Sequence, residues 1–231
     1  MSSRLGGSGI QTYVFPYYAL DANACSATSN VIVSAPAAAV AGETFPLTVE
    51  IQNTSNQRDT NFVGTVRFSS TDPAAVLPAD YTFTLADAGS HTFNVELRTG
   101  GARIVSAVVG GAIGSRTITV SPGAPAQLTF IDLPGSPEVD KLLTPPVRVG
   151  VSDAFDNVVT NATGSVALTL GNNLNSASLL GTTQGTVVNG VATFPGLSIN
   201  KVGVFSFIAT YPGGLTRTSE LFAVTEGPVG D

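Results

Sequence analysis

Hydrophobic and polar side chains alternate one by one along several short stretches of this chain. The alternating stretches are residues 47–51, 81–85, 93–97, 147–151, 166–170 and 205–209. A period of two residues, carried by β-branched and aromatic side chains, is typical of strands that bury one face. Turn signals such as Thr99-Gly100-Gly101 and Asn189-Gly190 separate the stretches. The pattern therefore predicts short antiparallel strands without intervening helices.

The same pattern occurs twice at a fixed spacing. Residues 46–69 align with residues 146–169 without a gap, at an offset of 100 positions. Identical pairs are Pro46/Pro146, Val49/Val149, Thr60/Thr160, Asn61/Asn161, Gly64/Gly164 and Val66/Val166. The correspondence returns at residues 101–107 against residues 203–209. A repeat of this length indicates that one structural unit has been duplicated.

Each unit holds about seven predicted strands in roughly 95 residues, which is the content of an immunoglobulin-like sandwich. We therefore predict an all-β chain of two tandem immunoglobulin-like antiparallel β-sandwiches. An N-terminal arm covers residues 1–30, the first sandwich covers residues 31–121, and the second covers residues 126–226. The linker between them, SPGAP at residues 121–125, is too short for a flexible tether and carries two prolines. We expect a semi-rigid joint.

Several stretches are similar to a known class of repeats. They are FSSTDPAAVLPADYTFT (residues 68–84), AGSHTF (88–93), VGVSDAFDNVVT (149–160) and VNGVATFPGLSI (188–199). These stretches resemble the Ig-like and filamin-like repeats of large bacterial surface proteins, including invasin- and intimin-type adhesins. The resemblance covers about 195 residues and leaves out the arm. It implies a fold more than a function, because such domains serve adhesins, enzyme spacers and virion proteins alike.

The composition argues against several classes of function. The net charge is −6, and the ten lysines and arginines are scattered singly, whereas binding to nucleic acid needs clustered cations. No run approaches the roughly 18 apolar residues of a membrane helix. Cys25 is the only cysteine, so no intrachain disulfide can form. We expect no nucleic-acid partner and no membrane span, and stability must come from hydrophobic cores.

The chain carries little catalytic equipment. A Ser-His-Asp triad would have to use His91, the only histidine. That residue shares the inward parity of Phe93 and Val95 at the start of a predicted strand, so we expect a structural position at the rim or edge. The sequence has no GxSxG elbow, and neither Lys141 nor Lys201 follows a phosphate-binding loop. We predict no catalytic residue, no cofactor and no enzymatic activity.

Pairs of acidic residues occur in predicted turns. Asp153 and Asp156 follow a strand at a corner, where aspartate normally bonds to its own turn backbone. Asp72, Asp80 and Asp87 form a second, looser acidic group. Calcium would need six to eight oxygens that converge on one point. We therefore predict no metal site, with turn chemistry as the first interpretation and calcium at Asp153 and Asp156 as the alternative.

The arm has an unusual content of aromatic residues. It carries Tyr13, Val14, Phe15, Tyr17 and Tyr18, and thus three of the five tyrosines. Exposed rings are useful only where they pack on something. Two interpretations stay open: the segment covers the first sandwich as an added strand or flap, or it docks onto another subunit or assembly by strand addition to an open edge.

Together these features favour a non-enzymatic structural or adhesive protein that is displayed on a surface and anchored through its arm. The partners expected are neighbouring subunits at the arm, and surface glycans at faces rich in Thr, Ser and Asn. The location is extracellular, either on a bacterial cell surface, as the resemblance implies, or on a virion exterior as a capsid decoration. The virion setting is considered because residues 13–25 make a poor secretion signal.

Two rival functions follow from the same sequence. The first is a carbohydrate-binding or spacer portion of a larger secreted enzyme, in which a neighbouring domain would be catalytic. The second is a hydrolase, which would have to depend on His91.

Overall fold

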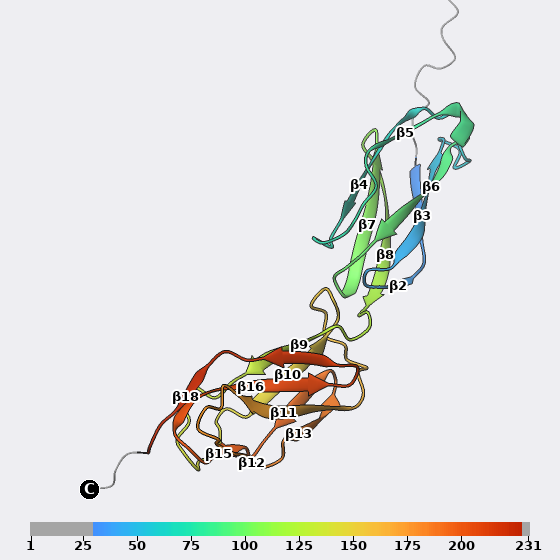
Figure 1. The fold of residues 1–231 in the computed structure, drawn as a ribbon. Helices are drawn as coiled ribbons and strands as arrows, with labels where there is room; N and C mark the ends of the chain where they lie inside the picture. The colour runs from blue at the N-terminus through green and yellow to red at the C-terminus, as the bar shows by residue number, and fades with distance from the viewer. Residues whose placement is uncertain (1–29, 228–231) are drawn as a thin grey trace, which may run out of the picture.

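The computed structural model describes residues 30–227 and arranges them as two β-sandwiches placed end to end (Figure 1). Strands make up the regular structure of this range, apart from the three-residue 3-10 turn η1 (Leu85–Asp87). The prediction of an all-β chain with two tandem immunoglobulin-like sandwiches is confirmed. Across residues 30–227 the structure has no helix with the length and apolarity required to cross a membrane.

The first sandwich consists of two sheets. Its strands are β1 (Asn30–Ser34), β2 (Ala38–Val40), β3 (Thr44–Gln52), β4 (Gly64–Ser70), β5 (Tyr81–Phe83), β6 (Ser90–Glu96), β7 (Gly101–Val109) and β8 (Ala112–Ser121). One sheet has the order β1-β3-β6 and the other β2-β8-β7-β4-β5. The pairing is antiparallel except between β2 and β8, which run parallel. The chain therefore changes sheets between β1 and β2.

The core of the first sandwich follows the alternation seen in the sequence. In β3 the side chains of Phe45, Leu47, Val49 and Ile51 are buried, while the residues between them are exposed or half-buried. They belong to one hydrophobic cluster with buried residues of the other sheet, such as Ile118 of β8. The period of two thus places one face of each strand between the sheets.

The second sandwich has ten strands. They are β9 (Gln127–Asp132), β10 (Val147–Ser152), β11 (Ser165–Gly171), β12 (Leu179–Leu180), β13 (Gln184–Val188), β14 (Val191–Phe194), β15 (Ser198–Ile199), β16 (Gly203–Tyr211), β17 (Leu215–Thr218) and β18 (Phe222–Val224). The long sheet has the order β17-β16-β11-β13-β14-β10-β9, β18 pairs with β16, and β12 pairs with β15. Residues 184–186 of β13 pair with β11, whereas residues 187–188 pair with β14. The strand β13 therefore passes from the layer that contains β11 to the layer that contains β14.

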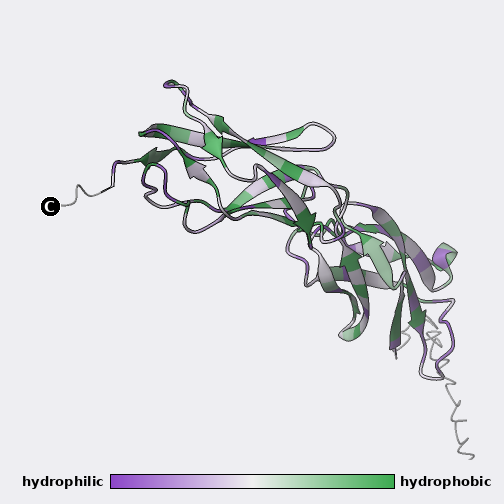
Figure 2. Cartoon of the chain, turned by 90° about the horizontal axis from the view of Figure 1, so that it is seen from below, coloured by the Kyte–Doolittle hydropathy of each residue, from purple (hydrophilic) through white to green (hydrophobic). Residues whose placement is uncertain are grey.

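Each sandwich closes its own hydrophobic core. One cluster runs from Val31 to Val120 and the other from Leu128 to Val224, and they share no residue. Figure 2 shows hydrophobic residues along the strands of both sandwiches. The domain limits given above, 31–121 and 126–226, stay predictions. The predicted arm, residues 1–30, lies almost entirely outside the described residues.

Because the cores are separate, removal of core atoms should destabilise one sandwich at a time. Leu47 and Leu168 are fully or almost fully buried, in the first and second sandwich respectively. Replacing either with Ala should lower the free energy of unfolding of its own sandwich by about 2–5 kcal/mol. Hydrogen exchange followed by mass spectrometry resolves the two sandwiches. Leu174→Ala is the matched control, because this leucine is 93% exposed; equal losses in both sandwiches after one substitution would contradict separate cores.

Candidate functional site

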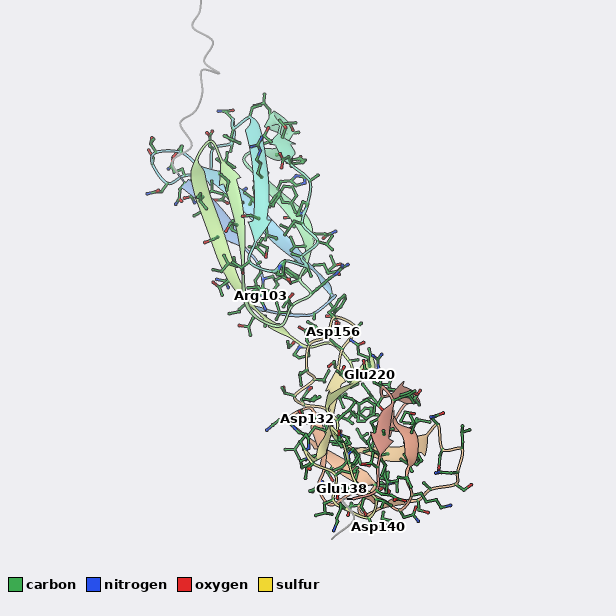
Figure 3. All side chains as sticks on the ribbon, turned by 90° about the vertical axis from the view of Figure 1, so that its left-hand side faces the viewer. Arg103, Asp132, Glu138, Asp140, Asp156 and Glu220 are labelled. Atoms are coloured by element: carbon green, nitrogen blue, oxygen red, sulfur yellow. The ribbon has the colours of Figure 1, made fainter. Side chains whose placement is uncertain are left out.

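A polar site lies where the two sandwiches meet. The turn Asp153–Asn157, which follows β10, contacts the loop 97–101, which leads from the end of β6 into the first residue of β7. Figure 3 shows Asp156 between the two sandwiches and Arg103 at the adjoining end of the first. We call this region the interdomain joint. It comprises the linker 121–125, the turn Asp153–Asn157 and the loop 97–101.

The carboxylate of Asp153 shapes the turn of the joint. Its Oδ1 accepts the backbone N–H groups of Phe155 (2.9 Å) and Asn157 (3.0 Å). The Asp153 N–H in turn donates to the Asn157 carbonyl (2.9 Å). Asp156 has a φ of +65°, a left-handed conformation that aspartate tolerates better than most residues. The side chain of Asp153, the first residue of the turn, therefore stabilises the turn conformation.

The second oxygen of the same carboxylate reaches the linker. Asp153 Oδ2 accepts the N–H of Gly123 (2.8 Å) and the side-chain amide of Asn157 (2.8 Å). Only 1% of Asp153 is exposed. Burial alone would raise its pKa, but the hydrogen bonds from Asn157, Gly123 and Phe155 outweigh that effect and hold the pKa below its ordinary value. The carboxylate thus stays charged and ties the linker to the turn.

Asn157 connects the turn to the first sandwich. Its Oδ1 accepts the N–H of Gly100 (2.7 Å), and its Nδ2 donates to the Arg98 carbonyl (2.7 Å) as well as to Asp153. One amide therefore binds both edges of the loop 97–101. These backbone groups would otherwise lack partners at the interface. The amide therefore fixes the position of one sandwich relative to the other.

An aromatic contact completes the joint. The ring of Phe155 lies so close to Gly42, in the turn between β2 and β3, that a Cβ added there would collide with it. Gly42 also has a φ of +82°, which favours glycine. The Arg98 guanidinium lies over the same ring, 5.4 Å from its centroid, in range for a cation–π interaction.

A second buried aspartate supports the loop that Asn157 binds. Asp72 is 3% exposed, and its Oδ2 accepts the N–H groups of Arg98 (2.7 Å) and Thr99 (2.9 Å). Its Oδ1 accepts the Thr99 hydroxyl (2.6 Å) and the Ala74 N–H. Burial opposes the charge, yet these hydrogen bonds hold the pKa of Asp72 below its ordinary value. Each side of the joint is thus organised by one buried carboxylate.

The acidic residues considered as metal ligands bond to different groups of the protein. Asp153 bonds to the turn and linker, and Asp156 Oδ1 accepts the Gln127 side-chain amide (2.6 Å). Asp80 pairs with Arg67 on the surface. Within residues 30–227 no group of three or more His, Cys, Asp or Glu residues is arranged to hold a metal ion. The turn interpretation accounts for the hydrogen bonds of Asp153 and Asp156, the absence of a metal site stays a prediction, and calcium there stays the alternative.

His91 belongs to a hydrogen-bonded corner of the first sandwich. Its Nδ1 lies 2.9 Å from Asp87 Oδ1, which also accepts the Tyr81 hydroxyl (2.9 Å). Asp87 Oδ2 accepts the N–H and hydroxyl of Thr84, and the Tyr81 and His91 rings stack with centroids 4.3 Å apart. In the part of the chain that the structure describes, no serine hydroxyl is hydrogen-bonded to His91. The half-buried position agrees with the structural role expected for it.

Sequence reasoning located only part of this site. It identified Asp153, Asp156 and a semi-rigid linker, but it missed Gly42, the role of Asp72 and the contacts of Asn157 with the first sandwich. The spacing from Asp153 to Asn157 signals a turn, whereas nothing local signals that the turn faces another sandwich. The predicted docking residues Tyr13, Val14, Phe15, Tyr17 and Tyr18 lie outside the described residues, so their role stays a prediction.

Comparison with known proteins gives structural likeness only. No family model and no curated protein matches the sequence. Solved structures with a similar arrangement include the D00-D0 domain of intimin, with 10% identity, a TM-score of 0.48, and coverage of 85% of this chain and 100% of that chain. Invasin, described as a bacterial integrin-binding protein, has 16% identity, a TM-score of 0.38, and coverage of 87% and 40%.

A β-glucuronidase from glycoside hydrolase family 2 is also similar, with 15% identity and a TM-score of 0.41. The match covers 87% of this chain but only 20% of the enzyme, so the chain spans about a fifth of that protein. The sequence resembles invasin- and intimin-type repeats, and an invasin and an intimin structure are among the solved structures with a similar arrangement. At these identities no activity follows from any of the likenesses.

The corner around His91 predicts a dependence of stability on pH. The Thr84 N–H, with help from His91 and Tyr81, holds the pKa of Asp87 far below its ordinary value of 3.8. A carboxylate with a lowered pKa stabilises the folded state above its unfolded pKa and loses this contribution as the pH falls. The melting temperature of Asp87→Asn should therefore lie below that of the wild type near neutral pH. The difference should shrink below about pH 4, and a constant difference down to pH 2 would contradict a role for the charge.

Proposed function

We propose that this chain is a non-enzymatic structural protein, displayed on a surface, in which the interdomain joint holds two sandwiches as a stiff rod. The observation that carries the proposal is the pair formed by Asp153 and Asn157. These two side chains bind the linker at Gly123 and the first sandwich at Arg98 and Gly100. A chain that only needed two independent domains would gain nothing from burying a carboxylate between them.

The direction of the strands supports an extended shape. Gly42 lies at the joint, β3 then runs away from it to Gln52, and Asn30 pairs with Gln52. The described chain therefore begins at the end of the first sandwich that is remote from the joint. Figure 1 shows β18 at the opposite end of the rod. An anchor placed before residue 30 would hold the second sandwich away from the surface.

The exposed faces support a role in binding without catalysis. Cross-strand threonine pairs lie on the surface, such as Thr48–Thr92 and Thr65–Thr82, with hydroxyl oxygens 2.9 Å and 3.0 Å apart. Uncharged hydroxyls and amides suit polar, hydrated contacts such as those with glycans. We place the protein on a bacterial cell surface, in line with the repeats that its sequence resembles. A virion exterior and a spacer in a larger secreted enzyme are the alternatives.

The stiffness of the rod depends on Asn157. Asn157→Ala removes both hydrogen bonds to the first sandwich and leaves the Arg98 carbonyl and the Gly100 N–H without protein partners, at about 1–3 kcal/mol per buried group. With Cys25 replaced by Ser and spin labels at Ser69→Cys and Thr169→Cys, the distance distribution between the sandwiches should be narrow in the parent protein and broad in the variant.

Asn94→Ala is the matched control for this experiment, because Asn94 is an exposed asparagine on β6 that lies outside the joint. It should leave the distribution unchanged. A broad distribution in the parent protein would reject the stiff rod, and so would a narrow distribution in Asn157→Ala. Melting curves of all variants show whether each sandwich stays folded.

Anchoring is tested by removing the aromatic arm. Deletion of residues 1–25 should release the protein from the cell envelope of its source into the soluble fraction, because the arm holds Tyr13, Phe15, Tyr17 and Tyr18. Replacement of these four rings with Ser in the full chain should have the same effect. Circular dichroism should show both sandwiches still folded. Envelope association that survives both changes would refute anchoring by the arm.

A further inference from the structure

We propose that the free end of the second sandwich binds the Asn53–Gln57 turn of a second copy of this chain, as the first sandwich binds the Asp153–Asn157 turn within one copy. This inference goes beyond the stiff rod, since it joins rods head to tail. It is carried by the recurrence of both halves of the interdomain joint at the two ends of the described pair of sandwiches that lie away from the joint.

The turn half of the joint is repeated in the first sandwich. Asn53 N–H donates to the Gln57 carbonyl (2.8 Å), and Asn53 Oδ1 accepts the N–H groups of Ser55 (2.9 Å) and Gln57 (3.1 Å). The corresponding bonds of the Asp153–Asn157 turn are 2.9, 2.9 and 3.0 Å. Asn56 has a φ of +58°, against +65° for Asp156. The two turns therefore present the same backbone.

The receiving half of the joint is repeated in the second sandwich. At the joint, Ala41 N–H donates to the Ser121 carbonyl and Gly42 N–H to the Leu97 carbonyl (2.9 and 2.8 Å). At the free end, Val139 N–H donates to the Thr225 carbonyl and Asp140 N–H to the Ile199 carbonyl (both 2.9 Å). The φ angles are +82° at Gly42 and +60° at Asp140. Asp140 thus occupies the place of Gly42, and Figure 3 shows it at the end of the rod remote from the joint.

The side chains at the two free ends have changed in a complementary way. In the joint a large ring, Phe155, lies on a glycine, Gly42. The equivalent residues at the free ends are Ser55 and Asp140. A phenylalanine would collide with any Cβ at this position, whereas a serine leaves room for it. The Ser55 hydroxyl can also donate a hydrogen bond to the Asp140 carboxylate.

The receiving end also offers the backbone groups that an amide needs. In the joint, Asn157 binds the Arg98 carbonyl and the Gly100 N–H, which lie one and three residues after Leu97. The residues one and three positions after Ile199, the equivalent of Leu97, are Asn200 and Val202. Neither the Asn200 carbonyl nor the Val202 N–H makes a hydrogen bond within residues 30–227. Gln57, which stands where Asn157 stands in the other turn, carries the side-chain amide to bind both.

At the Asn53 turn, a second copy fits better than a preceding domain joined through a linker like that of the joint. In the joint, Asp153 Oδ2 accepts the linker N–H of Gly123. Asn53 has an amide nitrogen in place of that oxygen, and an amide nitrogen accepts no hydrogen bond. The Asn53 turn is therefore built for docking without a linker that follows the path of Gly123. The contact uses different surfaces on the two copies, so it extends into linear chains instead of closing into a dimer.

The test is sedimentation velocity of the full chain over a range of concentrations. The weight-average sedimentation coefficient should rise with concentration. Ser55→Phe should weaken association by about tenfold or more, because the ring meets the Cβ of Asp140. Ser55→Phe combined with Asp140→Gly recreates the Phe155–Gly42 pair and should restore association. Ser69→Phe, at an exposed serine on β4, is the control and should behave as the wild type.

Three results would overturn the proposal: a wild type whose sedimentation coefficient does not change with concentration, a Ser55→Phe variant that associates normally, or a double variant that is not rescued. Association that depends on residues 1–25 but not on Ser55 or Asp140 would assign the interface to the arm and also overturn it. Distance measurements within one copy at high dilution test the joint separately, so failure of the stiff rod is distinguishable from failure of self-association. Melting temperatures of the variants control for folding.

Discussion

The structure depends on a carboxylate that is buried between two domains and must be fully hydrogen-bonded. Asp153 is 1% exposed and receives four hydrogen bonds, from the N–H groups of Gly123, Phe155 and Asn157 and from the Asn157 side chain. A buried charge without such partners would be strongly destabilising. Its two oxygens therefore require the turn to curl inward and the linker to run beside it. The curled turn brings Asn157 against the loop 97–101 of the first sandwich, whose backbone is hydrogen-bonded to Asp72.

The alternation of side chains was sufficient to predict the strands because burial between two sheets imposes a period of two wherever it occurs. Leu47, Val49 and Ile51 are buried as the pattern required. The parallel pairing of β2 with β8 and the double pairing of β13 were not predictable in this way. Both depend on which strands become neighbours in space, and a single sequence carries no local signal for that choice.

The candidate site was predicted in part for a similar reason. The turn at Asp153 was recognised because aspartate bonds to nearby backbone, which is a local effect. The loose group of Asp72, Asp80 and Asp87 was grouped by type, yet the fold sends these residues to the joint, to Arg67 and to His91. Contacts across more than fifty positions, such as that between Arg98 and Asn157, are visible only once both sandwiches are placed. The duplicated unit has meanwhile kept its turn backbone and changed the side chains of the turn, with Ser55 and Gln57 in the first sandwich at the positions of Phe155 and Asn157 in the second.

The parallel pairing of β2 with β8 has a mechanical consequence. Tension along the rod pulls the chain before Asn30 away from the joint and pulls the linker toward the second sandwich. The last residues of β8 lie beside β2, at Ala38–Thr119, Ala39–Val120 and Val40–Ser121, and both strands point toward the linker. Such a load shears these pairs side by side, so they must break together instead of opening one after another. The first sandwich thereby gains resistance to forced unfolding at the strands next to its linker.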